Sequence, residues 1–352
     1  MIEKLTQEAI VLLQNMIAKP SFSSEEDETA LLIMQWFSTH NIKFESNDHN
    51  VWAKNKFFDA SKPTILLNSH HDTVKPNKGY TKDPFYPEIT DGKLFGLGSN
   101  DAGGSLVSLL ATFAYFYEYE NLKYNLVIVA SAEEESSGHK GLNSMLSIIP
   151  KIDVAIVGEP TLMQLAIAEK GLLVLDCYAQ GTAGHAAHGL GDNAIYKAME
   201  AMNWFKTYQF PKVSDTLGKV KMTVTQVNAG SQHNVIPAEC HFVVDIRVTD
   251  AYNNQEVLDI IKENVSIVVK ERSLRLNSSS IPDTHALVKS GIALGRSTYG
   301  SPTLSDQSVL TCPSLKLGPG DSLRSHTADE FIYIHEIEEG IQLYVDLLQN
   351  IL

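Results

Sequence analysis

Short apolar runs alternate with amphipathic helical patterns in the first half of this chain of 352 residues. The clearest runs are TILLNSH (64–70), NLVIVASAEE (125–134) and DVAIVGEP (153–160), and a helical pattern over 105–119 lies between the first two. Runs of consecutive apolar residues, without alternation of apolar and polar side chains, are typical of strands buried on both faces of a sheet. The alternation therefore predicts an α/β fold in which helices cover both faces of the sheet.

The pattern changes after Glu169. A strand, a helix, two strands and a second helix are predicted in that order, over 171–184, 193–208, 219–228, 239–248 and 253–269. A serine-rich break at 277–280 ends this region. The order is typical of a ferredoxin-like α+β domain inserted into a larger one. We therefore expect one domain formed by 1–167 and 278–352, and an inserted domain over 168–277.

Acidic and histidine side chains follow the predicted strands at the points where the strands end. They are His70, Asp72, Glu134, Glu135, Glu159 and, after a strand and a GPGDS turn, His326. In an open α/β sheet the ligand crevice lies outside the carboxyl ends of the strands. One arrangement therefore gathers all of these side chains at a single rim, together with Asp101 from a glycine-rich turn.

Carboxylates and imidazoles gathered in this way need a cation among them. Two histidines with several carboxylates and no thiolates suit Zn, Mn or Co better than Ca or Mg. Three anionic ligands, Asp101, Glu135 and Glu159, would overcompensate one divalent cation, so two cations give the better charge match. Asp101 is the natural bridge between them. Each short motif alone is more typical of a surface turn or a solvated charge run, and only their joint placement predicts a metal site.

The glycine-rich turn FGLGSNDAGGS (95–105) also allows another interpretation. Gly96 and Gly98 occupy the first two positions of a G-x-G-x-x-G nucleotide-binding motif. The third position is Asp101, whose carboxylate would meet the pyrophosphate that the motif binds. No second nucleotide signature follows, so a metal ligand is the better interpretation of this turn.

Composition limits the partners. The formal net charge of -14 argues against nucleic acid or an anionic membrane surface as a partner. The three cysteines are far apart and predict neither a disulfide framework nor a thiolate metal site. The N-terminal MIEKLTQEAIVLLQ lacks the pattern of a signal peptide, and no apolar run reaches the length of a membrane span. We expect a cytoplasmic protein.

A series of segments in order along nearly the whole chain resembles the M20 family of metallopeptidases and deacylases. The segments are PSFSSEE, SHHDTVKP, DPF, GLGSNDAGG, EEESSGHKGL, VGEPT, GTAGHAAHG, HNVIPAECHFVVDIR, TLSD and GPGDSLRSHTADE. The resemblance implies a mixed-sheet, zinc-peptidase-like catalytic domain with an inserted lid and dimerisation domain. It implies that one metal ion is bound by His70, Asp101 and Glu159, and a second by Asp101, Glu135 and His326. It also implies that Asp72 orients His70 and that Glu134 is the catalytic base.

The resemblance extends into the inserted domain. His185 matches a histidine that stabilises an oxyanion, in many members at the active site of the partner subunit, so a homodimer is expected. Asn234 and Arg247 match residues that hold the substrate's carboxylate. The chain departs from the family's frequent D-M-K-G after Asp101, and His188 stands where proline is frequent. We expect His188 to be exposed, with a substrate contact as the alternative.

The implied activity is hydrolysis of the amide bond of an N-acyl amino acid by a dinuclear metal-dependent amidohydrolase. The form of GPGDSLRSHTADE favours N2-acetylornithine or N-acetylcitrulline as the substrate, in arginine biosynthesis. Succinyl-diaminopimelate and a dipeptide are the alternative substrates. An inactive binding protein of the same fold is the alternative outside enzymes, but such a protein would be expected to lack the base or a ligand.

Overall fold

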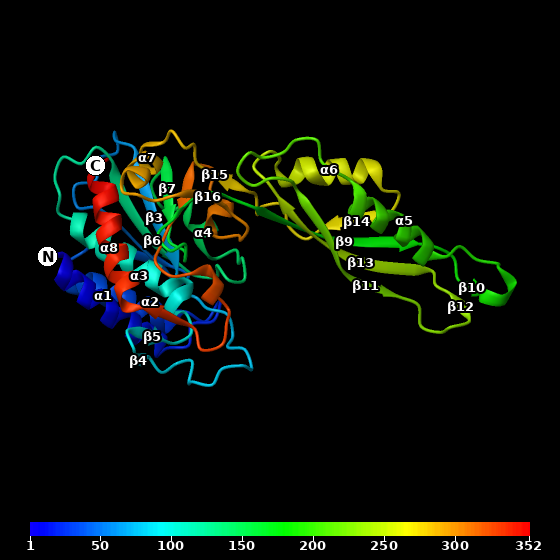
Figure 1. The fold of residues 1–352 in the computed structure, drawn as a ribbon, viewed down its shortest axis with the longest axis horizontal. Coiled ribbons are helices and arrows are strands. Elements are labelled where there is room, and N and C mark those ends of the chain that lie inside the picture. The colour runs from blue at the N-terminus through cyan, green and yellow to red at the C-terminus, as the bar shows by residue number, and fades with distance from the viewer. The chain divides into compact units, whose positions relative to one another are not determined.

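The computed structural model describes all residues from Met1 to Leu352, and the chain divides into two compact units. Unit 1 comprises Met1–Ile167, Ser280–Tyr299 and Ser305–Leu352, and both ends of the chain belong to it (Figure 1). Unit 2 comprises Ala168–Ser279 and Gly300–Leu304. No helix combines the length and the apolar character that a membrane crossing requires.

A mixed sheet forms the centre of unit 1, with the strand order β1-β2-β6-β3-β7-β17-β8. The strands are β1 (Phe44–Asn47), β2 (Asn50–Lys54), β3 (Thr64–His70), β6 (Asn125–Ser131), β7 (Val154–Val157), β8 (Leu165–Glu169) and β17 (Ser314–Lys316). The neighbours β6, β3, β7 and β17 are parallel, and β1, β2 and β8 pair in the antiparallel sense. Every residue of β3, β6 and β7 is buried, as the apolar runs predicted.

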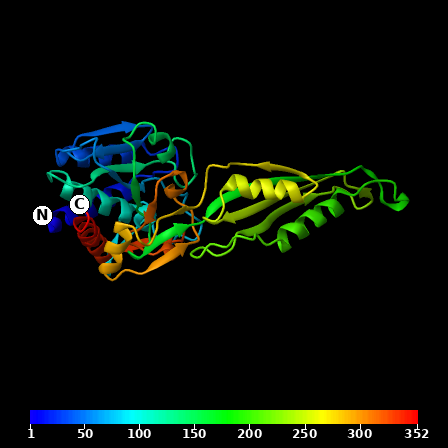
Figure 2. The ribbon, with the colours of Figure 1, turned by 90° about the horizontal axis from the view of Figure 1, so that it is seen from above.

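Helices cover both faces of this sheet. The larger layer packs into the main core and contains α1 (Ile2–Ile17), α2 (Asp27–Thr39), α3 (Gly104–Phe116), α7 (Ala286–Ala293) and α8 (Ile334–Gln349). Within it, α1, α3 and α8 lie against one another (Figures 1 and 2). The short α4 (Leu142–Met145) covers the other face, where Trp52, Leu66 and Val127 form a second core. The predicted α/β fold with a covered mixed sheet is confirmed.

A small antiparallel sheet completes unit 1, with the order β18-β5-β4. Its strands are β4 (Ile89–Thr90), β5 (Lys93–Phe95) and β18 (Phe331–Tyr333). Two further short strands, β15 (Ser279–Ser280) and β16 (Thr298–Ser301), belong to the mixed sheet, where both pair with β8.

Unit 2 is a four-stranded antiparallel sheet with two helices on one face. The strand order is β11-β13-β9-β14, and the elements are β9 (Gly171–Gln180), α5 (Ala194–Thr207), β11 (Lys221–Ala229), β13 (Glu239–Val248), α6 (Asn254–Asn264) and β14 (Val268–Glu271). The strands β10 (Gly184–His185) and β12 (Val235–Ile236) form a separate antiparallel pair, with two residues in each strand. The predicted helix over 253–269 is wrong at its end, because Val265, Ile267 and Val268 favour extended backbone and lead into β14.

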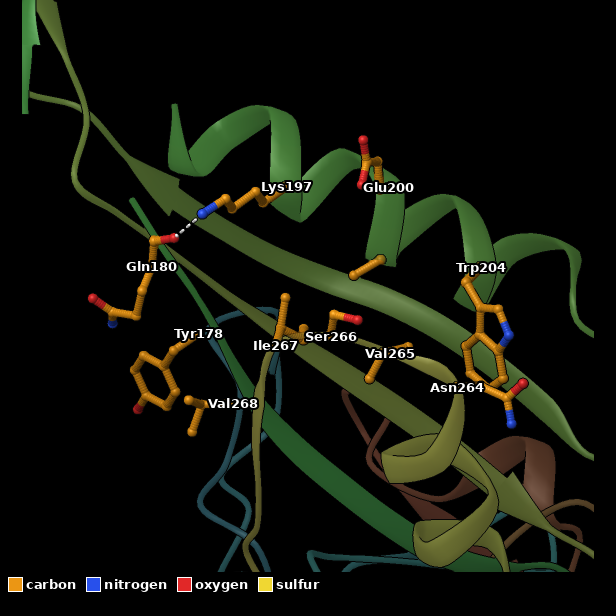
Figure 3. A pocket seen from close by; sticks show the side chains of 11 residues that line it. Tyr178, Gln180, Lys197, Glu200, Trp204, Asn264, Val265, Ser266, Ile267 and Val268 are labelled. Atoms are coloured by element: carbon orange, nitrogen blue, oxygen red, sulfur yellow. Dashed lines mark hydrogen bonds between the residues drawn. The ribbon is translucent and has the colours of Figure 1, made fainter. Parts of the chain in front are cut away.

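A groove of about 730 Å³ lies in unit 2 between α5, one end of β9 and the segment that joins α6 to β14 (Figure 3). Trp204 of α5 and Tyr178 of β9 contribute to its lining. Lys197 closes one side by donating to the backbone oxygen of Gln180, over 2.9 Å. None of the residues predicted to bind metal or substrate lines this groove.

Candidate metal centre

The parallel strands of unit 1 bring the predicted acids and the first histidine to one edge of the sheet. His70 is the last residue of β3, Glu159 comes two residues after β7, and Glu134 and Glu135 follow β6. The carboxyl ends of parallel strands meet at the same edge, so the predicted gathering of these side chains follows from the topology.

Asp101 lies on a turn formed by Ser99–Gly103, between β5 and α3. This turn needs glycine at two positions. Gly98 has a φ of 77°, and a Cβ at this residue would come within 2.5 Å of Thr73 Cγ2. A Cβ at Gly103 would lie 2.4 Å from the backbone oxygen of Gly98. The glycines therefore serve a tight turn that carries Asp101, whose peptide bond to Ala102 is cis.

His70, Asp101 and Glu159 form the first group of potential metal ligands. His70 Nε2 lies 3.3 Å from Asp101 Oδ1 and 3.6 Å from Glu159 Oε1. The side chain of His70 is only 1% exposed. One potential ligand atom from each residue lies within 4.8 Å of the others, so the three could hold one ion.

Asp101, Glu135 and His326 form the second group. His326 Nε2 lies 3.0 Å from Glu135 Oε2 and 3.6 Å from Asp101 Oδ2. Asp101 therefore presents Oδ1 to one histidine and Oδ2 to the other, which is the arrangement of a carboxylate shared by two ions. All five residues predicted as metal ligands are brought together.

Asp72 connects His70 to the turn that carries the two glutamates. Its backbone oxygen lies 2.9 Å from His70 Nδ1, and its Oδ1 lies 3.4 Å from the same nitrogen. The Asp72 carboxylate also accepts hydrogen bonds from the backbone N–H groups of Glu134 and Glu135, over 3.0 and 3.1 Å. With Nδ1 directed toward Asp72, Nε2 of His70 is free to face the ligand group.

Glu134 lies beside the first group, with Oε2 3.9 Å from His70 Nε2. Burial, followed by the charges of Glu159, Asp306 and Glu135, raises the pKa of Glu134 well above its usual range, although His70 acts in the opposite direction. Burial and the charge of Asp101 likewise raise the pKa of Glu159 to about 8. The site thus concentrates buried carboxylates that a cation would stabilise in their charged form.

The histidines respond to the same concentration of negative charge. Burial would lower the pKa of His70, but the hydrogen bonds and charges of the surrounding carboxylates raise it well above its usual value. The hydrogen bond to Glu135 is the main reason that the pKa of His326 rises to about 9. Nitrogen and carboxylate donors without a thiolate fit a divalent transition metal, so the residues present are chemically suited to the predicted ions.

The remaining predicted residues belong to unit 2. His185, on β10, is exposed, and its Nδ1 accepts a hydrogen bond from Ala187 N. Asn234 lies next to it, because β10 pairs with β12 and the backbone oxygen of Asn234 accepts from Ala186 N. His188 is exposed, and its ring centroid lies 5.0 Å from that of His185.

Arg247 lies elsewhere in unit 2, near the last residue of β13, and donates to both carboxylate oxygens of Asp245 over 2.9 and 3.1 Å. β12 precedes the other end of this strand. At a rise of about 3.3 Å per residue, Arg247 lies roughly 26 Å along β13 from its first residue. Within this chain, the structure therefore does not bring Arg247 together with Asn234 and His185.

Three buried acids near the site were not identified from the sequence. Glu26 is fully buried and accepts a hydrogen bond from Glu133 N over 3.1 Å. Asp306 accepts from Ser131 Oγ over 2.6 Å, and burial raises its pKa to about 6. Glu330 accepts from the backbone of the Asp101 turn. All three lie in segments quoted for the family resemblance, but the sequence pattern does not show that they are buried.

Comparison with known proteins identifies a family and two similar enzymes. The sequence pattern described as Peptidase family M20/M25/M40 matches residues 66–350. A succinyl-diaminopimelate desuccinylase of Wolbachia pipientis is 27% identical over 378 residues, which cover 97% of this chain and 92% of that protein. An acetylornithine deacetylase of Proteus mirabilis is 28% identical over 375 residues, which cover 97% of this chain and 96% of that protein.

The fold is also found in a solved structure. The M20 family metallo-carboxypeptidase Sso-CP2 from Sulfolobus solfataricus superposes with a TM-score of 0.76 at 16% identity, over 97% of this chain and 98% of that one. The matched range, residues 66–350, spans both ligand groups and Glu134. The chain therefore belongs to peptidase family M20/M25/M40 and is a hydrolase that acts on amide bonds.

Proposed function

We propose that this enzyme removes the acyl group from an N-acyl amino acid with the help of two divalent metal ions. His70, Asp101 and Glu159 hold one ion, and Asp101, Glu135 and His326 hold the other. Zinc is the proposed metal, with cobalt or manganese as alternatives. The observation that carries this proposal is the presentation of the two Asp101 oxygens to two different histidines, with Glu134 beside them.

When bound, the ions supply positive charge that lowers the pKa of a water molecule and polarises the amide carbonyl. Glu134 accepts a proton from that water molecule and later delivers it to the nitrogen of the departing amine. Its raised pKa supports the first of these tasks, since a carboxylate with a raised pKa is a stronger base than an ordinary glutamate. His185 donates a hydrogen bond to the amide oxygen as negative charge develops there.

Asn234 and Arg247 bind the carboxylate of the substrate in this proposal. Arg247 is suited to that role because its planar guanidinium can contact both carboxylate oxygens, as it does with Asp245. The separation of Arg247 from Asn234 and His185 within the chain supports an active site completed by a second copy. We therefore include a homodimer formed through the inserted domain, with unit 1 as the catalytic domain and unit 2 as the lid.

N2-acetylornithine, or N-acetylcitrulline, is the proposed substrate, cleaved to acetate and the free amino acid in the arginine biosynthesis of the cytoplasm. The similarity to an acetylornithine deacetylase over nearly the whole chain supports this choice. The relative named as a desuccinylase is similar to nearly the same degree.

One observation favours desuccinylation as the second candidate. Lys170, Lys221 and Arg247 lie close together in unit 2, since Lys221 pairs with Arg247 across the sheet. Burial, and then the positive charges of Lys221 and Arg247, lower the pKa of Lys170. Such a group of cations would suit a substrate that carries more than one carboxylate, as a succinyl amide does.

A side-by-side assay of the metal-loaded protein tests both candidates. The substrates are N-acetylornithine, N-acetylcitrulline, N-succinyl-diaminopimelate and a dipeptide, each with Zn²⁺, Co²⁺ and Mn²⁺. A deacetylase gives its highest kcat/KM with the acetyl compounds, and Lys221→Gln leaves that value nearly unchanged. A desuccinylase prefers the succinyl compound and loses activity in the same variant. If the metal-loaded protein hydrolyses none of these compounds, the proposal is wrong.

A further inference from the structure

Glu330 has no role in the proposed chemistry, yet its carboxylate is buried beside the ligand groups. The residue comes directly before β18, and only 2% of its surface is exposed. β18 pairs with β5 so that Phe331 lies opposite Phe95. This register sets Glu330 against Gly96, whose N–H donates to the Glu330 backbone oxygen over 3.0 Å. The small sheet thereby directs Glu330 toward the turn that carries Asp101.

The Glu330 carboxylate accepts three hydrogen bonds, all from backbone N–H groups of that turn. Oε2 accepts from Gly98 N over 3.2 Å. Oε1 accepts from both Asn100 N and Asp101 N, over 2.8 and 2.9 Å. The successive N–H groups of a glycine-rich turn commonly enclose an anion. Here the enclosed anion is a side chain from the other end of the chain.

These bonds act on the part of the backbone that decides where Asp101 points. The N–H of Asp101 itself is one of the donors, so its peptide plane is held directly. Asp101 is also the one residue that belongs to both ligand groups. A small rotation of this residue would move Oδ1 away from His70 or Oδ2 away from His326, and so change both groups at once.

A side chain that only filled space here would leave the backbone N–H groups of Gly98, Asn100 and Asp101 without this acceptor. The position therefore favours a side chain that reaches three donors at once over one that simply fills space.

We propose that Glu330 is a positioning residue, which sets the orientation of Asp101 for two ions by holding the 98–101 backbone. This inference rests on the proposed two-metal site. It assigns to Glu330 a contact with the turn only, and no contact with substrate or with the reacting atoms.

Three substitutions at Glu330 distinguish the effect of its hydrogen bonds to the turn from the effect of its negative charge. Glu330→Ala removes all three acceptors. Glu330→Gln keeps one oxygen, which can still accept from Asn100 and Asp101, but loses the charge. Glu330→Asp keeps the charge but withdraws the carboxylate by one methylene. Asp329→Ala is the matched control, because the Asp329 carboxylate accepts from the backbone of Thr81 and Lys82 and not from the Asp101 turn.

The experiment titrates the full-length, metal-free protein with Co²⁺ and follows the visible absorption spectrum of the ion, with folding checked by circular dichroism. Glu330→Ala and Glu330→Asp should bind Co²⁺ about 10-fold to 100-fold more weakly and with an altered spectrum, as loss of a group that orients a ligand typically does. Glu330→Gln should recover most of the affinity and the wild-type spectrum. In the loaded enzyme, kcat should fall more than KM rises for the Ala and Asp variants. Asp329→Ala should match the wild type.

Wild-type affinity and spectrum in a folded Glu330→Ala protein would overturn the inference. Recovery by Asp but not by Gln would also overturn it, because charge and not hydrogen-bond reach would then matter. If Glu330→Ala does not fold, the other two variants still test the inference. Recovery of Co²⁺ affinity by Glu330→Gln supports it, and recovery by Glu330→Asp alone overturns it. Failure of the two-metal proposal has a different signature, since the wild type would then bind fewer than two ions, or Asp101→Ala would bind two ions normally.

Discussion

At the scale of single residues, Glu134 and Glu135 are sequence neighbours to which we assign different tasks. Glu135 contacts His326, whereas Glu134 lies beside His70 without belonging to either ligand group. Glu134→Gln should therefore retain both metal ions and lose activity by about 100-fold or more, which is the usual contribution of a general acid and base. Glu135→Gln should instead lower the metal content. Elemental analysis and kcat measured on the same samples check both expectations.

The two variants serve as controls for each other, since they make the same change on adjacent residues. A Glu134→Gln enzyme with near wild-type kcat would contradict the assignment of the base. A Glu135→Gln protein with two tightly bound ions would contradict the assignment of the second ligand group.

The ionisable groups of the site predict how the stability of chelator-stripped protein depends on pH. Glu159 has a folded pKa of about 8, against an ordinary value of 4.5, so between these values it binds a proton when folded and releases it when unfolded. Its contribution to stability is therefore lost as the pH rises through this window. His326, with a pKa raised from 6.5 to about 9, acts in the same direction. Asp72 and Asp101 have lowered pKa values, and their effect is confined to more acidic solution.

The melting temperature of the stripped protein should consequently be higher at pH 5 than at pH 8. Divalent metal ions compete with protons for the same groups, so added Zn²⁺ should raise the melting temperature more at pH 8 than at pH 5. Scanning fluorimetry with and without Zn²⁺ measures both effects, and Glu159→Gln should flatten the dependence. A stripped protein that becomes more stable from pH 5 to pH 8 would contradict the prediction.

At the scale of elements, the turn after β6 is held from two sides before any metal binds. Asp72 accepts the N–H groups of Glu134 and Glu135, and Glu26, just before α2, accepts the N–H of Glu133. Glu26 also accepts from Ser24 N over 2.7 Å and lies 2.8 Å from His49 Nδ1. The start of α2 is thus connected to the segment that carries the base.

Removing this connection should affect both stability and turnover. Glu26→Ala leaves buried N–H groups without an acceptor, so the free energy of unfolding should fall by about 1–3 kcal/mol. The kcat should fall as well, because the backbone next to Glu134 is no longer held. Urea unfolding and steady-state kinetics measure these changes. Glu25→Ala, at an exposed neighbouring position, is the control. If Glu26→Ala and Glu25→Ala have the same free energy of unfolding and the same kcat, the Glu26 contacts contribute to neither stability nor turnover.

The elements that position the ligands could be predicted from the sequence because their signals are local. Runs of consecutive apolar residues mark β3, β6 and β7, and the polar residues at or just after the end of each run lie at the site. The end of the helix after Asn253 could not be predicted, since Val265, Ile267 and Val268 fit either a helix or a strand. The contact of Glu330 with Asn100 and Asp101 depends on the pairing of β18 with β5, which lie far apart in the sequence. A local sequence pattern cannot predict a contact between segments so far apart in the chain.

At the scale of the whole molecule, the proposed homodimer makes a specific prediction about mixtures of variants. If His185 acts on the active site of the partner subunit, an inactive Glu134→Gln dimer and an inactive His185→Ala dimer should restore activity when their subunits exchange. Each mixed dimer then contains one intact site, so random exchange should recover roughly a quarter of wild-type activity. Refolding the two variants together and then measuring kcat tests this.

The same mixture distinguishes the alternative arrangement. If His185 acts within its own chain, every site of a mixed dimer lacks either the histidine or the base, and no activity returns. Co-refolding each variant with itself is the control for recovery during refolding. Analytical ultracentrifugation of the wild type provides an independent measurement, and a monomer that is fully active would contradict the dimer.

The two ligand groups differ in how far water reaches their histidines, since His70 is 1% exposed and His326 is 56% exposed. An incoming ligand needs access to an ion before it can displace a protein ligand, so the two ions should leave at different rates. Brief dialysis against a chelator should release the ion held by His326 first and leave the one held by His70. A second, different metal could then be loaded into the emptied position. The unequal exposure of two histidines would thus provide a route to a mixed-metal enzyme, in which each ion can be observed separately.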